Sequence, residues 1–181
     1  MGRSARADGE PDPAADTGPD ADVESFARQI MLRRLTDQPR TRADLADTLA
    51  KKRVPDEVAR AQLDRFTDVG LIDDESFARS WVESRRRSKG LAGRALAHEL
   101  RRKGVDDEIV AETIGGIDAE DERETARLLV RKKLRSMRSQ DAQTQTRRLA
   151  GMLARKGYSA GVAFSVVREE LAVHAEALDT P

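Results

Sequence analysis

The sequence predicts an all-α fold of three tandem three-helix repeats in an elongated array, preceded by a disordered acidic tail. Composition is the first observation that predicts it. Only 38% of the 181 residues are hydrophobic, against roughly 45–50% in a compact globular chain, so one large core is not expected. Aromatic residues make up only 3% of the chain, which leaves too few strand formers for a β-sandwich or barrel. The second observation is an internal repeat.

The repeat is visible as a recurring word. Ser25-Phe26-Ala27-Arg28 returns unchanged as Ser76-Phe77-Ala78-Arg79, 51 residues later. The register then holds through both copies, because Leu45 and Leu49 in the first correspond to Leu96 and Leu100 in the second. A constant period over a whole segment indicates repeated structural units rather than one folded body.

Each repeat is predicted to contain three helices. In the first, helical periodicity begins at Val23 and stops before Pro39, a second helix spans 41–52, and a third runs from Pro55 to Gly70. In the second, Asp73-Asp74 open a helix that Gly90 closes, the next spans 93–103, and the last runs from Asp106-Asp107 to Gly115-Gly116. We therefore expect the tail at residues 1–22 and repeats at 23–72, 73–118 and 119–181.

The third repeat is the most divergent. It contains Glu124-Thr125-Ala126-Arg127 where the others have Ser-Phe-Ala-Arg, and then Leu149 and Leu153. The spacing leaves five extra residues between its first two helices, near 136–143. An insertion of this kind is predicted to lie in a loop, since loops tolerate added residues better than packed helices do.

Composition and motifs give no support for catalysis. The chain has no Cys, which excludes disulfides, thiolate metal sites and a cysteine nucleophile. His98-Glu99 begins a metalloprotease motif, but Arg102 stands where the second His is needed, and a cation cannot ligate zinc. The acidic pairs at 73–74 and 106–107 fall at helix starts, where carboxylates act as caps. We predict no catalytic residue, metal site or cofactor, and therefore no enzyme.

No segment reads as a membrane span or a secretory signal. The apolar run at 162–167 is short and interrupted by Ser165, far below the ~20 residues that cross a bilayer. Charges near the N-terminus are not followed by an apolar stretch. We expect a cytoplasmic, monomeric protein that does not bind membranes.

Charge is divided into blocks, although 33 basic and 33 acidic residues sum to zero. The tail carries six acidic and two basic residues, a net of −4. Residues 79–103 carry a net of +7, residues 104–124 a net of −8, and residues 125–156 a net of +9. For the acidic block and the first repeat, solvated helix faces explain the charges.

The two basic blocks differ, because their charges gather on helix faces. Opposite the apolar pair Leu96 and Leu100 lie Arg94, His98, Arg101 and Arg102. The aligned basic positions of the third repeat include Arg147 and Arg155, whereas the first repeat has Ala43, Asp47, Ala50 and Lys51. Basic faces on a helical repeat indicate a polyanion or an acidic protein surface as partner.

One segment resembles a known family. Residues 70–82 read G-L-I-D-D-E-S-F-A-R-S-W-V, an Arg-rich helix follows, and residues 96–104 read L-A-H-E-L-R-R-K-G. This run resembles the motif of the RecX family of recombinase regulators, and the tandem three-helix organisation agrees with that family. Thr125 departs from the pattern, because the other repeats have Phe there.

The resemblance implies a non-enzymatic protein that binds RecA recombinase and its nucleoprotein filament and inhibits strand exchange, ATP hydrolysis and coprotease activity in DNA repair and the SOS response. We hypothesise that a set of basic side chains contacts filament or DNA: Arg85, Arg86, Arg87, Lys89, Arg94, Arg101, Arg102, Lys103, Arg127, Arg131, Arg135, Arg138, Arg147 and Arg155. Two alternatives stay open at this point, an independent DNA-binding helical module and a general protein-interaction repeat.

Overall fold

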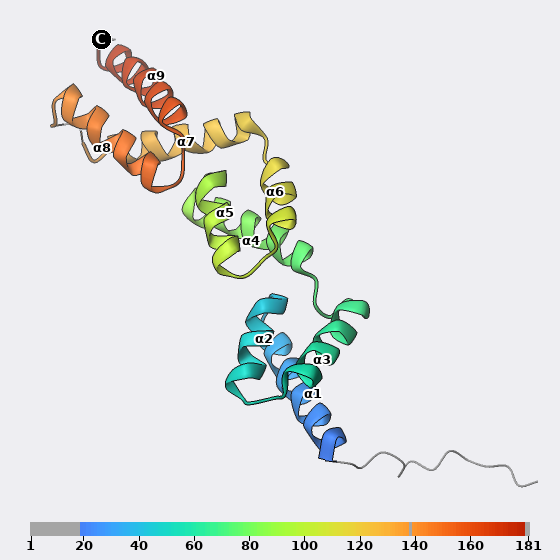
Figure 1. Ribbon diagram of the computed structural model, residues 1–181. Coiled ribbons are helices and arrows are strands. Elements are labelled where there is room, and N and C mark those ends of the chain that lie inside the picture. Colours follow the sequence, from blue (N-terminus) through green and yellow to red (C-terminus); the bar gives the residue numbers. More distant parts are fainter. Residues whose placement is uncertain (1–18, 138, 180–181) are drawn as a thin grey trace, which may run out of the picture.

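The computed structural model describes residues 19–137 and 139–179, and this part of the chain is helical throughout. Its first unit contains α1 (Pro19–Asp37), α2 (Arg42–Lys51) and α3 (Asp56–Asp68). The second contains α4 (Asp74–Lys89), α5 (Gly93–Arg102) and α6 (Asp107–Gly115), and the third α7 (Ala119–Leu134), α8 (Ala142–Arg155) and α9 (Ala160–Asp179). The units follow one another in an extended array, with α1 at one end and α9 at the other (Figure 1). The predicted fold class is confirmed.

Capping residues explain where the helices begin and end. Thr41, Asp73 and Asp141 each accept a hydrogen bond from the backbone N–H three residues ahead. Accepting the N–H of Ser76 stabilises the charged form of Asp73 and lowers the pKa of this carboxyl. At the other end, Gly90 closes α4 in the left-handed conformation.

Two regions differ from, or lie beyond, the sequence-based expectations. The first helix begins at Pro19 rather than Val23, because proline is tolerated at a first helical position, where its missing N–H has no helical partner to lose. Residues 1–18 of the predicted tail lie outside the described residues. The predicted insertion of the third repeat, near 136–143, lies mostly in the connection between α7 and α8, but its last residues, 142–143, belong to the first turn of α8.

Each unit encloses its own small core. In the first unit Ala27 and Met31 of α1 pack with Leu45 and Leu49 of α2 and with Phe66 of α3. The second and third units repeat this arrangement around Leu96 and Leu100, and around Leu149 and Leu153. The repeated leucine pairs of the sequence are therefore the fully buried centre of each unit.

The joint between the first and second units is polar. The Thr41 hydroxyl, at the start of α2, donates to the carbonyl of Lys103 at the end of α5, 2.7 Å away. The Lys103 ammonium lies 3.6 Å from the Asp44 carboxylate. The backbone N–H of Arg42 donates to Asp74 at 2.9 Å. Burial raises the pKa of the Asp74 carboxyl, although this bond from Arg42 acts in the opposite direction.

The joint between the second and third units uses the same positions and adds apolar packing to its hydrogen bonds. The N–H of Ala92, which precedes α5, donates to the carbonyl of Lys156 at the end of α8, at 2.9 Å. The Tyr158 hydroxyl donates to the carbonyl of Gly90 at 3.1 Å. Ala92 itself is buried in the core of the third unit, so these two units share apolar packing.

A glycine with positive φ makes each joint possible. Gly104 has φ +72°, and a Cβ placed on it would lie 2.3 Å from the Cβ of Ala43. Gly157 has φ +93°, and its Cβ would lie 2.5 Å from the backbone nitrogen of Ala95. The corresponding residue of the first unit is Arg53, which is exposed and has φ 61°. Glycine is thus required where a unit docks on its predecessor, and no docking constrains Arg53.

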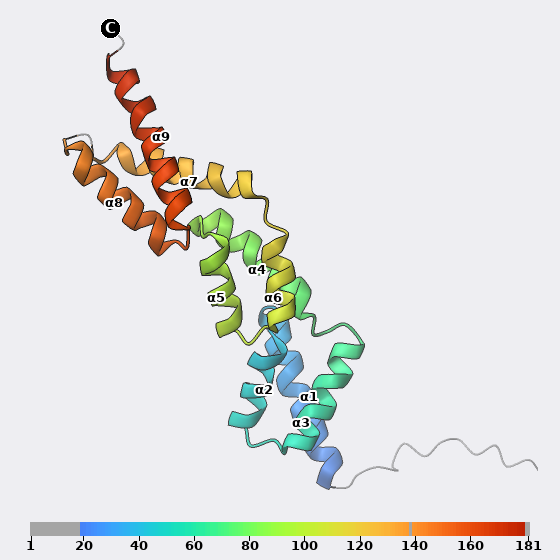
Figure 2. The ribbon, with the colours of Figure 1, turned by 45° about the horizontal axis from the view of Figure 1, so that its top comes forward.

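The joints place the second helices of the units in one row. The end of α8 meets the start of α5, and the end of α5 meets the start of α2. Both views show α2, α5 and α8 following one another along the same side of the array (Figure 2). Lys52, Lys103 and Lys156 cap the three helices, where positive charge opposes the negative end of the helix dipole.

The outer end of this row is built differently. Thr41 and Ala92 precede their helices, but the aligned residue of the third unit, Gln145, lies inside α8, which begins one turn earlier. Gln145 is buried and donates to the carbonyl of Met137 at 2.9 Å. The surface that receives the next unit elsewhere is therefore occupied from within the third unit.

We expect Gly104→Ala to destabilise the protein more than Gly70→Ala. Gly70 has the same backbone conformation, φ +73°, but nothing within 4 Å of an added Cβ. Both changes incur about 1–2 kcal/mol of backbone strain, and only Gly104→Ala adds overpacking of about 1–3 kcal/mol. Urea unfolding measures the difference, and the added change Ala43→Gly should recover it. Equal loss in the two single variants would contradict the joint.

Tyr158 gives the joint between the second and third units a pH dependence. Burial raises the pKa of its hydroxyl to about 12 from 10.0. As pH rises from 10 to 12, the unfolded chain loses this proton first, so stability from Tyr158 falls across that window. Thermal unfolding of wild type and Tyr158→Phe should show a steeper alkaline decline in wild type. Parallel declines would contradict the assignment.

Candidate functional site

The outer faces of α5 and α8 carry the exposed part of the predicted basic set. Arg94 and Arg102 on α5 are exposed, as are Arg147 and Arg155 on α8. None of these four forms an ion pair with another described residue. Arg101 pairs with Asp107 at 2.6 Å, but both side chains are exposed, so solvent competes strongly for the pair.

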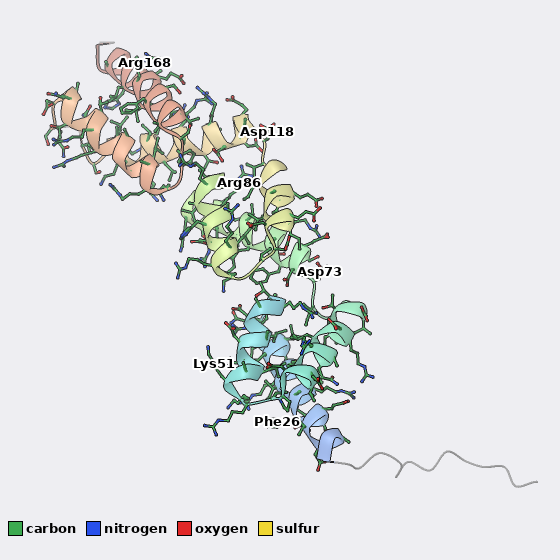
Figure 3. The ribbon with its side chains drawn as sticks, viewed as in Figure 1. Phe26, Lys51, Asp73, Arg86, Asp118 and Arg168 are labelled. Carbon is green, nitrogen blue, oxygen red and sulfur yellow. The ribbon has the colours of Figure 1, made fainter. Side chains whose placement is uncertain are left out.

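These arginines form one surface because α5 and α8 are joined end to end. Figure 3 shows side chains with nitrogen tips projecting from both helices. In α2 the row continues with Ala43, Asp47 and Ala50, and Lys51 lies at the helix end. We call the exposed side chains of Arg94, Arg101, Arg102, Arg147 and Arg155 the basic row. It spans the second and third units and ends at the first.

The C-terminal half of α4 holds four predicted residues with different environments. Arg85 is half-buried, with its guanidinium 4.1 Å from the centre of the Trp81 ring and its Nε 3.2 Å from Glu99. Trp81 donates its indole N–H to the same carboxylate at 2.9 Å. Arg85 is therefore held in a cluster within the second unit, whereas Arg87 and Lys89 are exposed and Arg86 is half-buried.

Lys103 also contributes to structure. Its ammonium lies between Asp44 at 3.6 Å and the Trp81 ring centre at 4.8 Å. It thus links the cluster around Trp81 to the joint between the first two units. Sequence reasoning did not find this role, because Asp44 is distant in the chain and only the joint brings it close.

Two arginines of α7 are engaged by acidic residues within the third unit. The Arg127 side chain is only 21% exposed and pairs with Glu120 at 2.7 Å and Glu124 at 3.1 Å. Arg131 binds the buried carboxylate of Glu170 with two bonds, at 2.7 and 2.8 Å. These carboxylates raise the pKa of both guanidinium groups. Arg131 fixes α7 against α9, whereas the two bonds of Arg127 lie within α7 and only its longer ion pair with Glu169, at 3.9 Å, reaches α9.

Arg123 extends this arrangement by one turn. Its guanidinium reaches Glu169 at 3.2 Å and the Ser165 hydroxyl at 3.3 Å, both on α9. The spacing of Arg123, Arg127 and Arg131 on one α7 face was a usable signal, but their α9 partners depend on packing. Of the remaining predicted residues, Arg135 is exposed, and Arg138 lies outside the described residues.

The described part of the chain contains no cluster of three or more His, Cys, Asp or Glu side chains suited to a metal ion. His98 is exposed on α5, and His174 belongs to α9 of the next unit. Among the described helices, none combines the length and apolar character needed to cross a membrane.

Fold and surface together define a helical tandem-repeat protein with a basic face on two of its three units. Each of the three units matches a family model of its own. The model for the RecX first three-helix domain matches residues 27–66, that for the second matches 73–114, and that for the third matches 120–167. The chain belongs to the RecX family.

The similarity to relatives and to a solved structure extends over most of the chain. The regulatory protein RecX of Thermobifida fusca is 48% identical over 97% of this chain and 95% of its own length. That of Streptomyces lividans is 54% identical over 84% of this chain and 81% of its own. A crystal structure of RecX from Lactobacillus salivarius superimposes with a TM-score of 0.77 at 21% identity, covering 83% of this chain and 97% of that one. The predicted family is confirmed.

We expect Glu170→Ala to lower the urea midpoint of unfolding, because Arg131 then loses its buried partner between α7 and α9. Glu169→Ala is the matched control, since this neighbouring carboxylate is 44% exposed and its pairs are screened by water. Circular dichroism follows both transitions. A larger effect of the control would show that the buried pair does not hold α9.

Proposed function

We propose that this protein binds RecA recombinase and RecA–DNA filaments and inhibits the recombinase, ATPase and coprotease activities of RecA in DNA repair and the SOS response. Its relatives carry the name regulatory protein RecX. The observation that supports this proposal most directly is the basic row, whose arginines are exposed on the consecutive second helices of two units. In this proposal the protein acts in the cytoplasm as a monomer and has no catalytic activity or cofactor of its own.

The proposed contact surface is narrower than the set of residues predicted from sequence. Arg94, Arg102, Arg147 and Arg155 are exposed and free of ion pairs within the described residues. Bringing them to an anionic surface breaks no internal interaction. Residues already engaged in the fold, such as Arg85, Arg127 and Arg131, support the shape of that surface.

An elongated row suits an extended partner. Several modest contacts on one chain reinforce each other, because each contact raises the effective concentration of the next. A filament offers repeated sites along its length, whereas a single globular partner does not. The alternative function is direct DNA binding by the same arginines, with RecA playing no part.

The test reverses the charge of Arg94, Arg101 and Arg102 together, by substitution with Glu. We expect inhibition of RecA ATPase activity to weaken more than tenfold, because three favourable contacts become repulsive. The matched control reverses Arg28, Arg60 and Arg65 on the exposed surface of the first unit, which changes net charge equally. Unchanged inhibition by a variant with intact helicity, or an equal loss of inhibition in the control, would contradict the assignment of these arginines to the contact surface.

A second measurement separates regulation from independent DNA binding. Wild-type protein is titrated with DNA alone, RecA alone and the ATP-loaded filament at two salt concentrations. Tight binding only to the filament supports the proposal. Equal affinity for naked DNA, with a salt dependence that falls by about one contact per arginine reversed, supports the alternative.

A further inference from the structure

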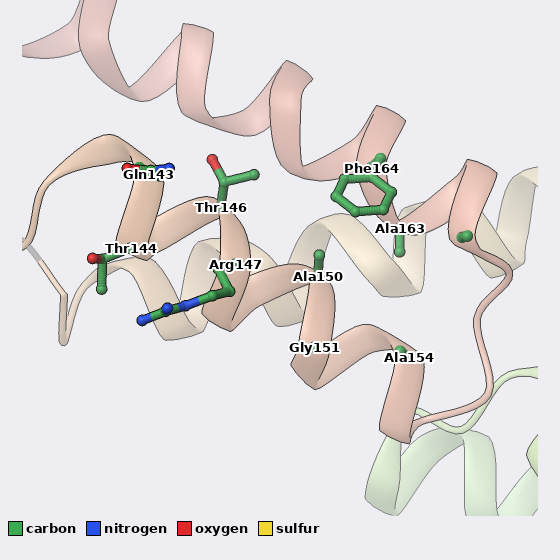
Figure 4. Close-up of a pocket in the computed structure, with 10 residues that line it drawn as sticks. Gln143, Thr144, Thr146, Arg147, Ala150, Gly151, Ala154, Ala163 and Phe164 are labelled. Carbon is green, nitrogen blue, oxygen red and sulfur yellow. The ribbon is translucent and has the colours of Figure 1, made fainter.

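A groove of about 680 Å³ lies between α8 and α9. Its lining includes Ala150, Gly151 and Ala154 of α8 and Ala163 and Phe164 of α9 (Figure 4). The Phe164 ring is 58% exposed and forms a wall of the groove. The small side chains leave an apolar floor beside an aromatic ring that the unit itself does not cover.

Comparison with the second unit shows that this floor is specific to the third. The α5 residues aligned with Ala150, Gly151 and Ala154 are Ala97, His98 and Arg101. Two polar residues of α5, His98 and the basic-row residue Arg101, are therefore replaced by Gly and Ala in α8. A Cβ on Gly151 would meet only the Arg155 side chain, at 3.5 Å, so internal packing does not require this glycine.

The rim of the groove is positively charged. Arg147 belongs to the lining, and no carboxylate does. Arg155 lies one turn from Gly151, and Arg168 lies one turn from Phe164; both are exposed and form no ion pair within the described residues. The groove between α4 and α6 provides a contrast, because its lining carries both signs of charge, with Glu75, Glu83 and Glu112 beside Arg79 and Arg86.

These features select a protein ligand over a nucleic acid. A phosphodiester backbone gains from the cations but nothing from an alanine floor, whereas an apolar side chain gains free energy when it leaves water. Carboxylates on either side of that side chain would meet the cationic rim. A helix that carries an apolar residue between acidic ones satisfies both requirements.

We propose that the α8–α9 groove receives an apolar side chain of the partner recombinase, presented on a helix between acidic residues. This inference rests on the proposed function and adds to it a second contact, apolar and directed at protein rather than DNA. The basic row supplies charge attraction along the array, and the groove supplies shape selectivity at the third unit.

The experiment uses two substitutions, one that removes a side chain from the groove and one that adds a side chain to it. Phe164→Ala removes the wall, and Gly151→Leu fills the floor while raising helix propensity, so loss of binding by the second variant does not reflect loss of the helix. Matched controls are Phe26→Ala, at a ring 48% exposed in the first unit, and Gly115→Leu, where an added Cβ meets nothing within 4 Å.

Affinities for the RecA–DNA filament and for naked single-stranded DNA are measured by fluorescence anisotropy of the labelled full chain, with circular dichroism to check folding. We expect both groove variants to bind the filament at least tenfold more weakly. Both controls should stay within twofold of wild type, and binding of all variants to naked DNA should change less than twofold.

The other outcomes overturn the inference in distinguishable ways. If wild type binds the filament and the groove variants bind it equally well, the groove has no role and the proposed function survives. If wild type does not bind the filament, both proposals fail. An equal loss of naked DNA binding would assign the groove to nucleic acid. A wild-type dimer that Phe164→Ala converts to a monomer would assign it to a second copy.

Discussion

The contact on which the rest of this structure depends is the seating of a glycine turn from one unit on the start of the second helix of the unit before it. Gly104 against Ala43 and Gly157 against Ala95 repeat this contact at both joints. Glycine has no side chain to collide with the preceding unit, so the two backbones approach closely. Carbonyl groups at the end of one second helix then accept hydrogen bonds from donors at the start of the neighbouring one. This geometry aligns α2, α5 and α8, and with them the exposed arginines of two units.

The role of each charged residue depends on where it lies in this array. Those at the joints and between helices are engaged internally: Lys103 bridges two units, and Arg131 grips a carboxylate that is only 5% exposed. Of those facing outward from the row, Arg94, Arg102, Arg147 and Arg155 form no ion pair among the described residues, and Arg101 has only an exposed partner, Asp107. Basic side chains of these two kinds therefore have different roles, because burial decides whether a cation stabilises the fold or remains available to a ligand.

Much of the fold was predictable from the sequence, and the site only partly. Helix order followed from the repeat, since Leu45, Leu96 and Leu149 mark equivalent core positions, and capping residues fixed most boundaries. The exposure of Arg94 and Arg147 followed from helical periodicity, which is a local property. The engagement of Arg131 and the groove beside Phe164 did not, because both depend on how α9 packs on α7 and α8. Side-chain partners that come from distant helices have no local signal.

Gln145 has a consequence for assembly. Elsewhere in the array the start of a second helix donates a hydrogen bond to the end of the following unit's second helix, and nothing in that chemistry limits the number of units that can stack. In the third unit the earlier start of α8 and the hydrogen bond that Gln145 donates to the carbonyl of Met137 occupy this position from within the unit. A free copy of the joint would let molecules join head to tail into an open fibre. By satisfying its own outer surface, the third unit removes the kind of site through which such a fibre would grow.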